Sequence, residues 1–519
     1  MEKKVNHYNC NYLLILFSIV IITIMWGMDI VRMIDWEIPN EIREGANIAV
    51  AEALAHGNNP FVYLGNLQGM PNVYYMYPIF NNLIASLFVR VFGLPAGLVL
   101  LLLNFLYTTL TAVVIATVTK HYVKNKYLVM LSFLMSHYCG WRYTNVSAFP
   151  DMLAVFMLVM IMYICTVKDE HIGNKEIIQL SVLTVLLFFT KQYAIVTAIP
   201  IIVYLGLKKE KSKCLKYIVF AAILGMISVA IVYFGMPLYF VETLLLVGNS
   251  ADNDFRWSIT QFVKIGKLFF PWFALILSWL FLELKKRRKI DFVAINFTLM
   301  AVMLLYFGQN TGAHLSYHLQ LWLPSIIVLG IRALDSLADV VNTKYQNVIW
   351  NFLIGFVALV AAVYPFYWLH TPQLSEEQKN NWRRLYEVAD QSENPLMTSQ
   401  NANYAILSGQ YIYDCGQNQY ILRNEALELW DKIKNSQMIK VLFPNAMELK
   451  QFHESYREEI INGLNNKEYD TLLLVDNFGF TRDWNEFQQT KDQCYELVEE
   501  IPIETGVWKW NVGIWKTRE

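Results

Sequence analysis

The stretch NYLLILFSIVIITIMWGMDIV (11–31) decides the fold class of this chain. It is apolar over the ~20 residues that a helix needs to cross the hydrocarbon core of a bilayer. No small-residue cleavage site follows it cleanly, so we interpret it as a retained helix and not as a signal peptide, although the chain opens with MEKK. Similar runs recur up to about residue 370, and only 16% of the 519 residues are charged, compared with about a quarter in soluble domains. The sequence therefore predicts a mostly α-helical, polytopic membrane protein.

Clusters of lysine and arginine orient the spans, since cytoplasmic loops collect these residues. Such clusters lie at 3–4, 120–126, 168–175, 208–213, 285–289 and 332–344. The spans that fit between them are 11–31, 97–119, 127–147, 151–167, 176–190, 193–207, 215–235, 265–284, 291–308, 317–334 and 347–368. Eleven spans place the N-terminus in the cytoplasm and the C-terminus outside. The segment 77–93 is expected to be short or partly inserted, because a full crossing there would turn the later basic loops outward. We therefore expect 11 to 13 spans.

The composition changes at about residue 370, where charged and amide residues become frequent. The runs IKVLF (439–443) and DTLLLVD (470–476) are typical of strands, and MELKQFHESYREEIINGL (447–464) is typical of a helix. We expect a transmembrane module over 1–369 and a small extracytoplasmic α/β domain over 370–519.

The first outer loop, IDWEIPNEIREGANIAVAEALAHGNNPF (34–61), combines acidic and apolar residues. Glu41 and Glu44 are three residues apart, so on a helix they share a face. An apolar stripe on the same helix predicts that it lies in the membrane interface; it consists of Ile42, Ala46, Ala49 and Ala53. These carboxylates are either a solvated face or include a general base beside a hydrophobic wall. Asp35 and Glu37, nearer the membrane exit, have the same two interpretations.

Two further sites carry charge at the predicted outer side. Asp151 begins a helix, where an acidic residue satisfies the helix dipole, but it also lies on the same side as the first-loop carboxylates. Lys191 and Gln192, in VLLFFTKQYAIVTAIP (185–200), are flanked by apolar residues, and a lysine there costs about 2–3 kcal/mol. Lys191 either snorkels to the interface or meets an anion, for which a lipid phosphate is the obvious candidate. Arg142 is either a second phosphate contact or a snorkelling anchor.

The loop GQNTGAHLSYHLQLWLP (308–324) gathers amide, imidazole and phenol groups, including Gln309, Asn310, His314, Tyr317 and His318. His314 and His318 have an i, i+4 spacing that also occurs in metal sites, but no glutamate-rich partner is nearby. Hydrogen bonding to sugar hydroxyls or a phosphate head group fits the mixture better. Several aromatic residues could stack on a sugar, although aromatics also collect at membrane interfaces. They are Trp36, Tyr63, Tyr74, Tyr75, Tyr77 and Trp141.

Composition argues against several classes of function. The net charge of −1 gives no indication of nucleic-acid binding. The six cysteines have no metal-ligand spacing, and nothing supports a disulfide between Cys415 and Cys494 in the tail. Sparse cysteines favour a bacterial inner membrane. A transporter is the main rival function, but we find no repeated halves, and the intramembrane charges gather on one side. A surface-polysaccharide polymerase or ligase and a binding-only scaffold also stay open as functions.

The motifs occur in an order that resembles one family. First, an acidic pair opens an interfacial helix, and the next membrane segment begins with Tyr-Pro and ends with Phe-Gly. An acidic residue then begins a later helix, and a Thr-Lys-Gln motif follows it. Finally, a loop with Gly, Asn and Tyr precedes a helix that contains a proline. The matching positions are 41–61, 77–78, 92–93, 151, 190–192 and 312–324. This order resembles the GT-C polyprenyl-phosphate-sugar glycosyltransferases, which include protein mannosyltransferases and the lipid A aminoarabinose transferase. Their first-loop residue is usually Asp, whereas Glu41 aligns best here, so the choice among the four first-loop carboxylates stays open.

The resemblance implies an inverting transfer of a sugar from a polyprenyl phosphate to a glycan, lipid or protein acceptor. Glu41 would accept the proton of the acceptor hydroxyl, and Asp151 would orient the acceptor or support that base. Lys191, with Arg142, would stabilise the phosphate as it leaves. The remaining substrate-binding candidates are Gln192, Tyr77, Asn310, His314, Tyr317 and His318. No cofactor is required, and a divalent metal is used by some members and not by others.

Overall fold

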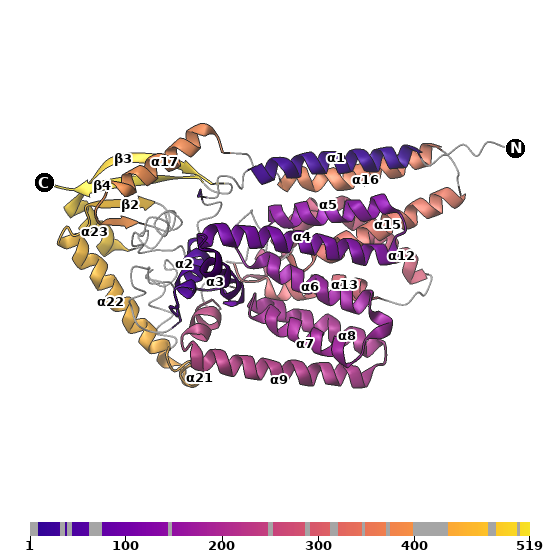
Figure 1. Ribbon diagram of the computed structural model, residues 1–519, viewed down its shortest axis with the longest axis horizontal. Helices are drawn as coiled ribbons and strands as arrows, with labels where there is room; N and C mark the ends of the chain where they lie inside the picture. Colours follow the sequence, from indigo (N-terminus) through magenta and orange to yellow (C-terminus); the bar gives the residue numbers. More distant parts are fainter. Residues whose placement is uncertain are drawn as a thin grey trace.

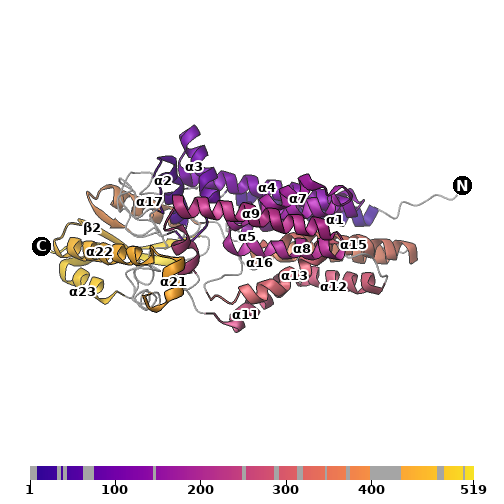
Figure 2. The ribbon, with the colours of Figure 1, turned by 90° about the horizontal axis from the view of Figure 1, so that it is seen from below.

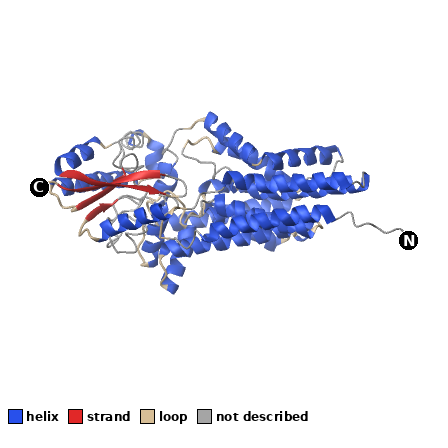
Figure 3. Cartoon of the chain, turned by 90° about the horizontal axis from the view of Figure 1, so that it is seen from above, coloured by secondary structure: helices blue, strands red, loops and turns tan. Residues whose placement is uncertain are grey.

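A computed structural model gives the arrangement of the chain, which is a long helical bundle with a small sheet domain at one end (Figures 1 and 3). We call the end of the bundle next to the sheet the domain end; the first helix begins at the opposite end. The structure describes residues 9–31, 37–38, 44–61, 75–143, 148–247, 253–285, 291–311, 320–344, 348–369, 374–397, 434–475, 484–505 and 509–519.

Each of the eleven predicted spans contains a helix, although the predicted span 193–207 begins in a 3-10 helix and the predicted span 265–284 begins in the helix that precedes α12. These helices are α1 (Asn9–Val31), α4 (Ala96–Tyr122), α5 (Lys126–Tyr143), α6 (Asp151–Thr166), α7 (Asn174–Phe188), α8 (Ala198–Leu207), α9 (Lys211–Gly235), α12 (Phe270–Lys285), α13 (Phe292–Phe307), α15 (Leu323–Lys344) and α16 (Val348–Leu369). The fold is thus the predicted polytopic helical bundle. Helix α15 begins later than the predicted 317–334, with Pro324 in its first turn, where a missing N–H costs little.

Three of the described helices, α1, α4 and α9, are long and apolar enough to cross a membrane alone. A fourth span is formed if α11 (Phe255–Leu268) and α12 are counted together, although the chain bends by 90° between them. Among the other helices of the bundle, α6, α7, α8 and α13 have 10 to 16 residues, whereas α15 and α16 have 22 residues each. Helix α6 is buried along almost its whole length. Helix α9 instead exposes its apolar side chains, as expected of a surface that faces lipid.

Two short helices lie at the domain end. Helices α2 (Glu44–Ala55) and α3 (Phe80–Phe92) are close to each other in both views (Figures 1 and 2). The 13 residues of α3 extend over only about 20 Å, which is less than the ~30 Å hydrocarbon core. The segment 77–93, predicted to be short or partly inserted, thus contains one helix of 13 residues. Helix α3 ends at Gly93, whose φ of 64° favours glycine.

One tryptophan side chain connects three helices of the bundle. The indole N–H of Trp272 in α12 donates to the carbonyl of Ala361 in α16 at 2.7 Å. The Trp272 ring lies against Gly330 in α15, where any Cβ would collide with the indole. Glycine at this position is thus what allows α12 and α15 to pack so closely around the ring.

The C-terminal part contains a four-stranded sheet in the order β1-β2-β4-β3. The strands are β1 (Pro395–Met397), β2 (Thr471–Val475), β3 (Tyr495–Glu504) and β4 (Lys509–Thr517), and the helices are α17 (Glu376–Asp390), α22 (Ala446–Asn465) and α23 (Asn485–Cys494). Strands β1 and β2 pair in parallel, and the other pairs are antiparallel. Helix α17 buries Trp382 and Leu385 in a core with Leu473 of β2. The predicted strand 470–476 and the predicted helix 447–464 are both confirmed.

The predicted strand at 439–443 is wrong. These residues lie in and just after the short helix α21 (Gln437–Leu442), which the hydroxyl of Ser436 caps by accepting from the amide of Ile439 at 3.3 Å. An apolar run of five residues does not distinguish a strand from a helix, and the cap decides between them.

Candidate functional site

A buried ion pair lies near the domain end of the bundle. Lys191 occupies an extended position in the turn after α7, directly before the 3-10 helix η3 (Gln192–Thr197), and Asp151 is the first residue of α6. The Lys191 Nζ lies 3.0 Å from the Asp151 Oδ1, and the two side chains are 1% and 7% exposed. Each charge offsets the cost of burying the other. The structure therefore brings together two residues that the sequence predicted separately.

Tyr77 completes the environment of this lysine. The Lys191 Nζ lies 4.3 Å from the centre of the Tyr77 ring, within the range of a cation–π contact. The ring is held in turn by edge contacts with Phe149 and Tyr75, at centroid distances of 5.7 and 5.9 Å. The ammonium is thus fixed between a carboxylate and an aromatic face.

Gln192 holds the backbone around this pair. Its amide nitrogen donates to the carbonyl of Met76 at 3.2 Å and to that of Thr243 at 2.8 Å. Both bonds tie the turn after α7 to segments far away in the sequence. These two bonds hold the Gln192 side chain in place, and its predicted contact with substrate stays a prediction.

Helix α2 of the first loop connects to the same place. The Tyr75 hydroxyl donates to the Asn47 Oδ1 at 2.6 Å, and the Asn82 amide donates to the Asn47 carbonyl at 3.3 Å. Glu44 lies one turn before Asn47 on the same helix and is buried. A first-loop carboxylate is therefore anchored within one helical turn of the residue that binds Tyr75. Asp35 and Glu41 lie outside the described residues, whereas Glu37 is described in the turn before α2.

Glu242 is a buried carboxylate that the sequence interpretation missed. It belongs to the π-helix η4 (Val241–Leu246), in the connection after α9 and outside the predicted spans. Its Oε2 accepts from the backbone N–H of Tyr75 at 3.1 Å, and burial raises the pKa of Glu242 well above its usual range. The sequence feature that could have indicated Glu242 is its position as the single acidic residue within the apolar run LYFVETLLLV (238–247).

Arg142 pairs with a second missed carboxylate, Asp29 of α1. The Arg142 Nε lies 3.5 Å from the Asp29 Oδ2, and both side chains are buried. The sequence contained a feature that could have indicated Asp29, namely a single acidic residue near the end of the first apolar span. An ionisable group in such a span usually has a charged partner or belongs to a functional site. The guanidinium thus joins α5 to α1, and the predicted role of Arg142 as a phosphate contact or a snorkelling anchor stays a prediction.

The late loop is described only in part. The backbone of Asn310 pairs with Asn253, and the carbonyl of Gln309 accepts from the amide of Asp254 at 2.8 Å. His314, Tyr317 and His318 lie outside the described residues. Within the described ranges, no three His, Cys, Asp or Glu side chains are grouped so as to hold a metal ion.

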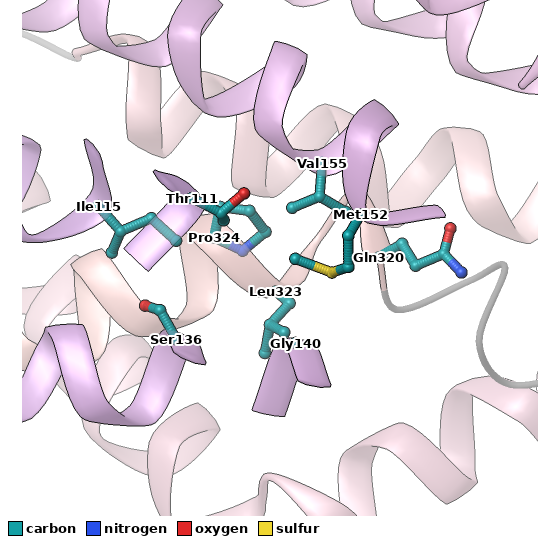
Figure 4. A pocket seen from close by; sticks show the side chains of 9 residues that line it. All are labelled: Thr111, Ile115, Ser136, Gly140, Met152, Val155, Gln320, Leu323 and Pro324. Carbon is teal, nitrogen blue, oxygen red and sulfur yellow. The ribbon is translucent and has the colours of Figure 1, made fainter. Parts of the chain in front are cut away.

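A small cavity lies next to the site, between α4, α5, α6 and α15 (Figure 4). It has a volume of about 10 Å³, which is room for about one water. Its walls include Met152, the neighbour of Asp151, and Gln320, whose amide oxygen accepts from the Tyr193 hydroxyl at 2.8 Å. This cavity is too small for a sugar.

Sequence comparison identifies no relative: no family model matches the chain, and no curated protein matches it. Solved structures, in contrast, match the chain. ArnT from Cupriavidus metallidurans bound to undecaprenyl phosphate is 10% identical, covers 96% of this chain and 97% of its own, and has a TM-score of 0.59. The Archaeoglobus fulgidus oligosaccharyltransferase tethered with an acceptor peptide is 11% identical, covers 96% of this chain and 73% of its own, and has a TM-score of 0.51. The chain spans 66% of the apo form of the latter, with a TM-score of 0.48.

At such low identity, these matches establish the arrangement of the chain alone. The match with ArnT extends over nearly the full length of both chains, so it includes the bundle and the C-terminal part. The chain therefore shares the fold of ArnT and of the archaeal oligosaccharyltransferase, in agreement with the fold that its resemblance to the GT-C glycosyltransferases implied.

Proposed function

We propose that this protein is an integral membrane glycosyltransferase that moves a sugar from a polyprenyl-phosphate donor to an acceptor on the extracytoplasmic face, with inversion at the sugar carbon. The observation that carries this proposal is the buried Lys191, held by Asp151 and Tyr77 near the domain end of the bundle. A cation fixed in an apolar setting is suited to bind a phosphate that arrives from the bilayer. On this proposal the domain end is extracytoplasmic and the membrane is a bacterial inner membrane.

Lys191 is the proposed phosphate contact. As the sugar leaves its carrier, negative charge builds on the phosphate, and a preorganised ammonium stabilises that charge most strongly in the transition state. Asp151 and the Tyr77 ring keep the ammonium in place before the donor binds. Asp151 is thus assigned to hold Lys191, whereas the pairing of Arg142 with Asp29 suits the packing of α5 against α1.

The transfer itself requires a base. The acceptor hydroxyl oxygen attacks C1 of the sugar from the face opposite the phosphate. The C1–O bond breaks, its electron pair stays on the phosphate oxygen, and the hydroxyl proton passes to a carboxylate of the first outer loop. Glu41 is our choice for this base, with Glu44 and Asp35 as the other candidates. The products are the glycosylated acceptor and the free polyprenyl phosphate.

The solved neighbours support the classes of donor and acceptor. ArnT was solved with undecaprenyl phosphate, and the archaeal oligosaccharyltransferase was solved with an acceptor peptide. We accordingly propose a donor on a polyprenyl phosphate and an acceptor that is a glycan, a lipid or a protein. The residues that would contact the acceptor belong to the first loop, to the loop at 308–324 and to the C-terminal part.

The test is an assay of membranes that carry the protein, supplied with a panel of polyprenyl-phosphate sugars, in which release of the carrier phosphate is followed. We expect release from at least one donor, and its loss in Lys191→Met. Lys264→Met is the matched control, because Lys264 is exposed on α11. Movement of the intact donor across vesicles without release of its sugar would overturn the proposal in favour of a transporter. Release of whole glycans would favour a polysaccharide polymerase or ligase.

A further inference from the structure

We propose that helix α21 lies in the lipid interface at the domain end and holds the C-terminal part of the chain on the bilayer. The partner is the layer of lipid head groups and adjoining acyl chains, so this is an interaction surface separate from the transfer site. The proposal does not depend on the transfer reaction, and its test needs no enzymatic activity.

The outer face of α21 is apolar and uncovered. Met438, Val441 and Leu442 are 69%, 72% and 55% exposed. Their spacing of i, i+3 and i+4 places the three side chains on one face of the helix. Lys440 on the same helix and Lys434 just before it are also exposed. An exposed apolar stripe on a helix that carries its lysines outside the stripe is the pattern of a helix that lies at a membrane surface.

The inner face of α21 is packed against the bundle. Ile439, and Phe443 just after the helix, join the apolar cluster that contains Met236 and Phe240, which follow α9. The amide of Asn445 donates to the carbonyl of Pro237 at 3.3 Å. Figure 1 shows α21 at the end of α9. The helix is therefore fixed to the place where α9 ends.

The end of α9 sets the level of α21 relative to the bilayer. The 25 residues of α9 extend over about 37 Å, so its ends reach the head groups of a ~30 Å hydrocarbon core. Near that end the lipid-facing surface of α9 exposes Ile231 at 67% and Phe234 at 81%. The outer face of α21 continues this surface at head-group depth, where its lysines can meet lipid phosphates.

The position of the stripe favours lipid over another occupant. A helix tied to the end of a lipid-facing span is next to the bilayer whenever that span is inserted. No separate binding step is needed, and the chain supplies both the apolar and the cationic groups that the interface requires. A second protein or a second copy of this chain would have to displace lipid at the same level, and the test below detects the second copy.

The test places a nitroxide label at single cysteines in nanodiscs of phosphatidylcholine and phosphatidylglycerol. Cys10, Cys214, Cys415 and Cys494 are first replaced by serine, while the buried Cys139 and Cys165 remain. The label at Val441→Cys is compared with Phe234→Cys, on the lipid face of α9. Val498→Cys is the aqueous control, since Val498 is 53% exposed on β3. Its neighbour Leu497 pairs with Trp515, close to the C-terminus that Figure 1 marks at the end far from the bundle.

We expect power saturation at Val441 to favour oxygen over a water-soluble nickel complex, as at Phe234, and the opposite at Val498. A Val441 label that is as accessible to nickel as the Val498 label would overturn the proposal. Dipolar broadening between Val441 labels would also overturn it, because a second copy would then cover the stripe. The variant Val441→Glu supplies an independent measurement. A carboxylate in the apolar stripe should weaken the contact of α21 with lipid, so the accessibility of a label at Met438→Cys to the nickel complex should rise several-fold.

Discussion

The ammonium nitrogen of Lys191 lies 3.0 Å from a carboxylate oxygen of Asp151, with both side chains out of reach of solvent. This pair joins the turn after α7 to the first residue of α6, and Tyr77 covers the ammonium from another side. Neither charge would be tolerated alone at this depth. The stability of this part of the bundle and the proposed binding of phosphate thus depend on the same two residues, and mutations can separate the two effects.

We expect Lys191→Met to lower the rate of sugar transfer by roughly 10²–10³-fold, the cost of removing one preorganised electrostatic group. It should also lower the free energy of unfolding by about 3–5 kcal/mol, because Asp151 is left as an unpaired buried charge. The double variant Lys191→Met/Asp151→Leu should recover most of this stability and none of the activity. The midpoint of thermal unfolding in detergent and the release of carrier phosphate measure the two quantities. Recovery of activity in the double variant would contradict the assignment of Lys191 to the phosphate.

The first-loop base can be assigned by comparing four amide substitutions. Glu41→Gln should lower the turnover number by at least about 10²-fold, the usual contribution of a general base, with folding unchanged. Glu44→Gln and Asp35→Asn should have smaller effects. Glu52→Gln is the matched control on α2, since Glu52 lies near His56 at the far end of that helix. If Glu44→Gln or Asp35→Asn shows the largest loss, the base is the residue concerned and Glu41 has another role.

Gln192→Leu should act through the backbone and not through contact with substrate. The substitution removes two hydrogen bonds and leaves the carbonyls of Met76 and Thr243 without that donor, at about 1–3 kcal/mol for each buried group. We expect a lower midpoint of thermal unfolding together with a modest loss of transfer. Gln489→Leu, on the exposed surface of α23, should change neither quantity. A loss of donor affinity in Gln192→Leu at unchanged stability would instead indicate direct contact with substrate.

The buried Glu242 predicts a pH dependence of stability. Burial raises the pKa of this carboxyl in the folded protein, so folding favours its protonated form. Its contribution to stability is complete below the unfolded value of about 4.3 and is lost as the pH rises through the folded pKa. The glutamine side chain of Glu242→Gln keeps an oxygen that can accept from the backbone N–H of Tyr75, but this side chain cannot ionise. The unfolding midpoint of the wild type should therefore fall relative to that of Glu242→Gln as the pH rises above about 4.3. Parallel profiles for the two proteins would contradict this expectation.

The sequence predicted the helices of the bundle well, because the hydrocarbon core requires apolar runs of a fixed length. It also placed Asp151 and Lys191 on the same side, since the basic loops orient every span. It could not predict their contact, which depends on how α6 and α7 pack. Asp29 and Glu242 were missed although each is a single acid in an apolar run. Local pattern was least informative at 439–443, where the serine cap and the packing on α9 outweigh the β-like composition.

Trp272 restricts which parts of the bundle can rearrange. Its indole bonds to α16 and fills the space above Gly330 in α15, so parting α12 from these neighbours would break a buried hydrogen bond and leave a void beside the ring. These three helices are therefore expected to behave as a rigid frame. On the proposed function, any movement that admits the lipid-borne donor would have to leave this frame intact.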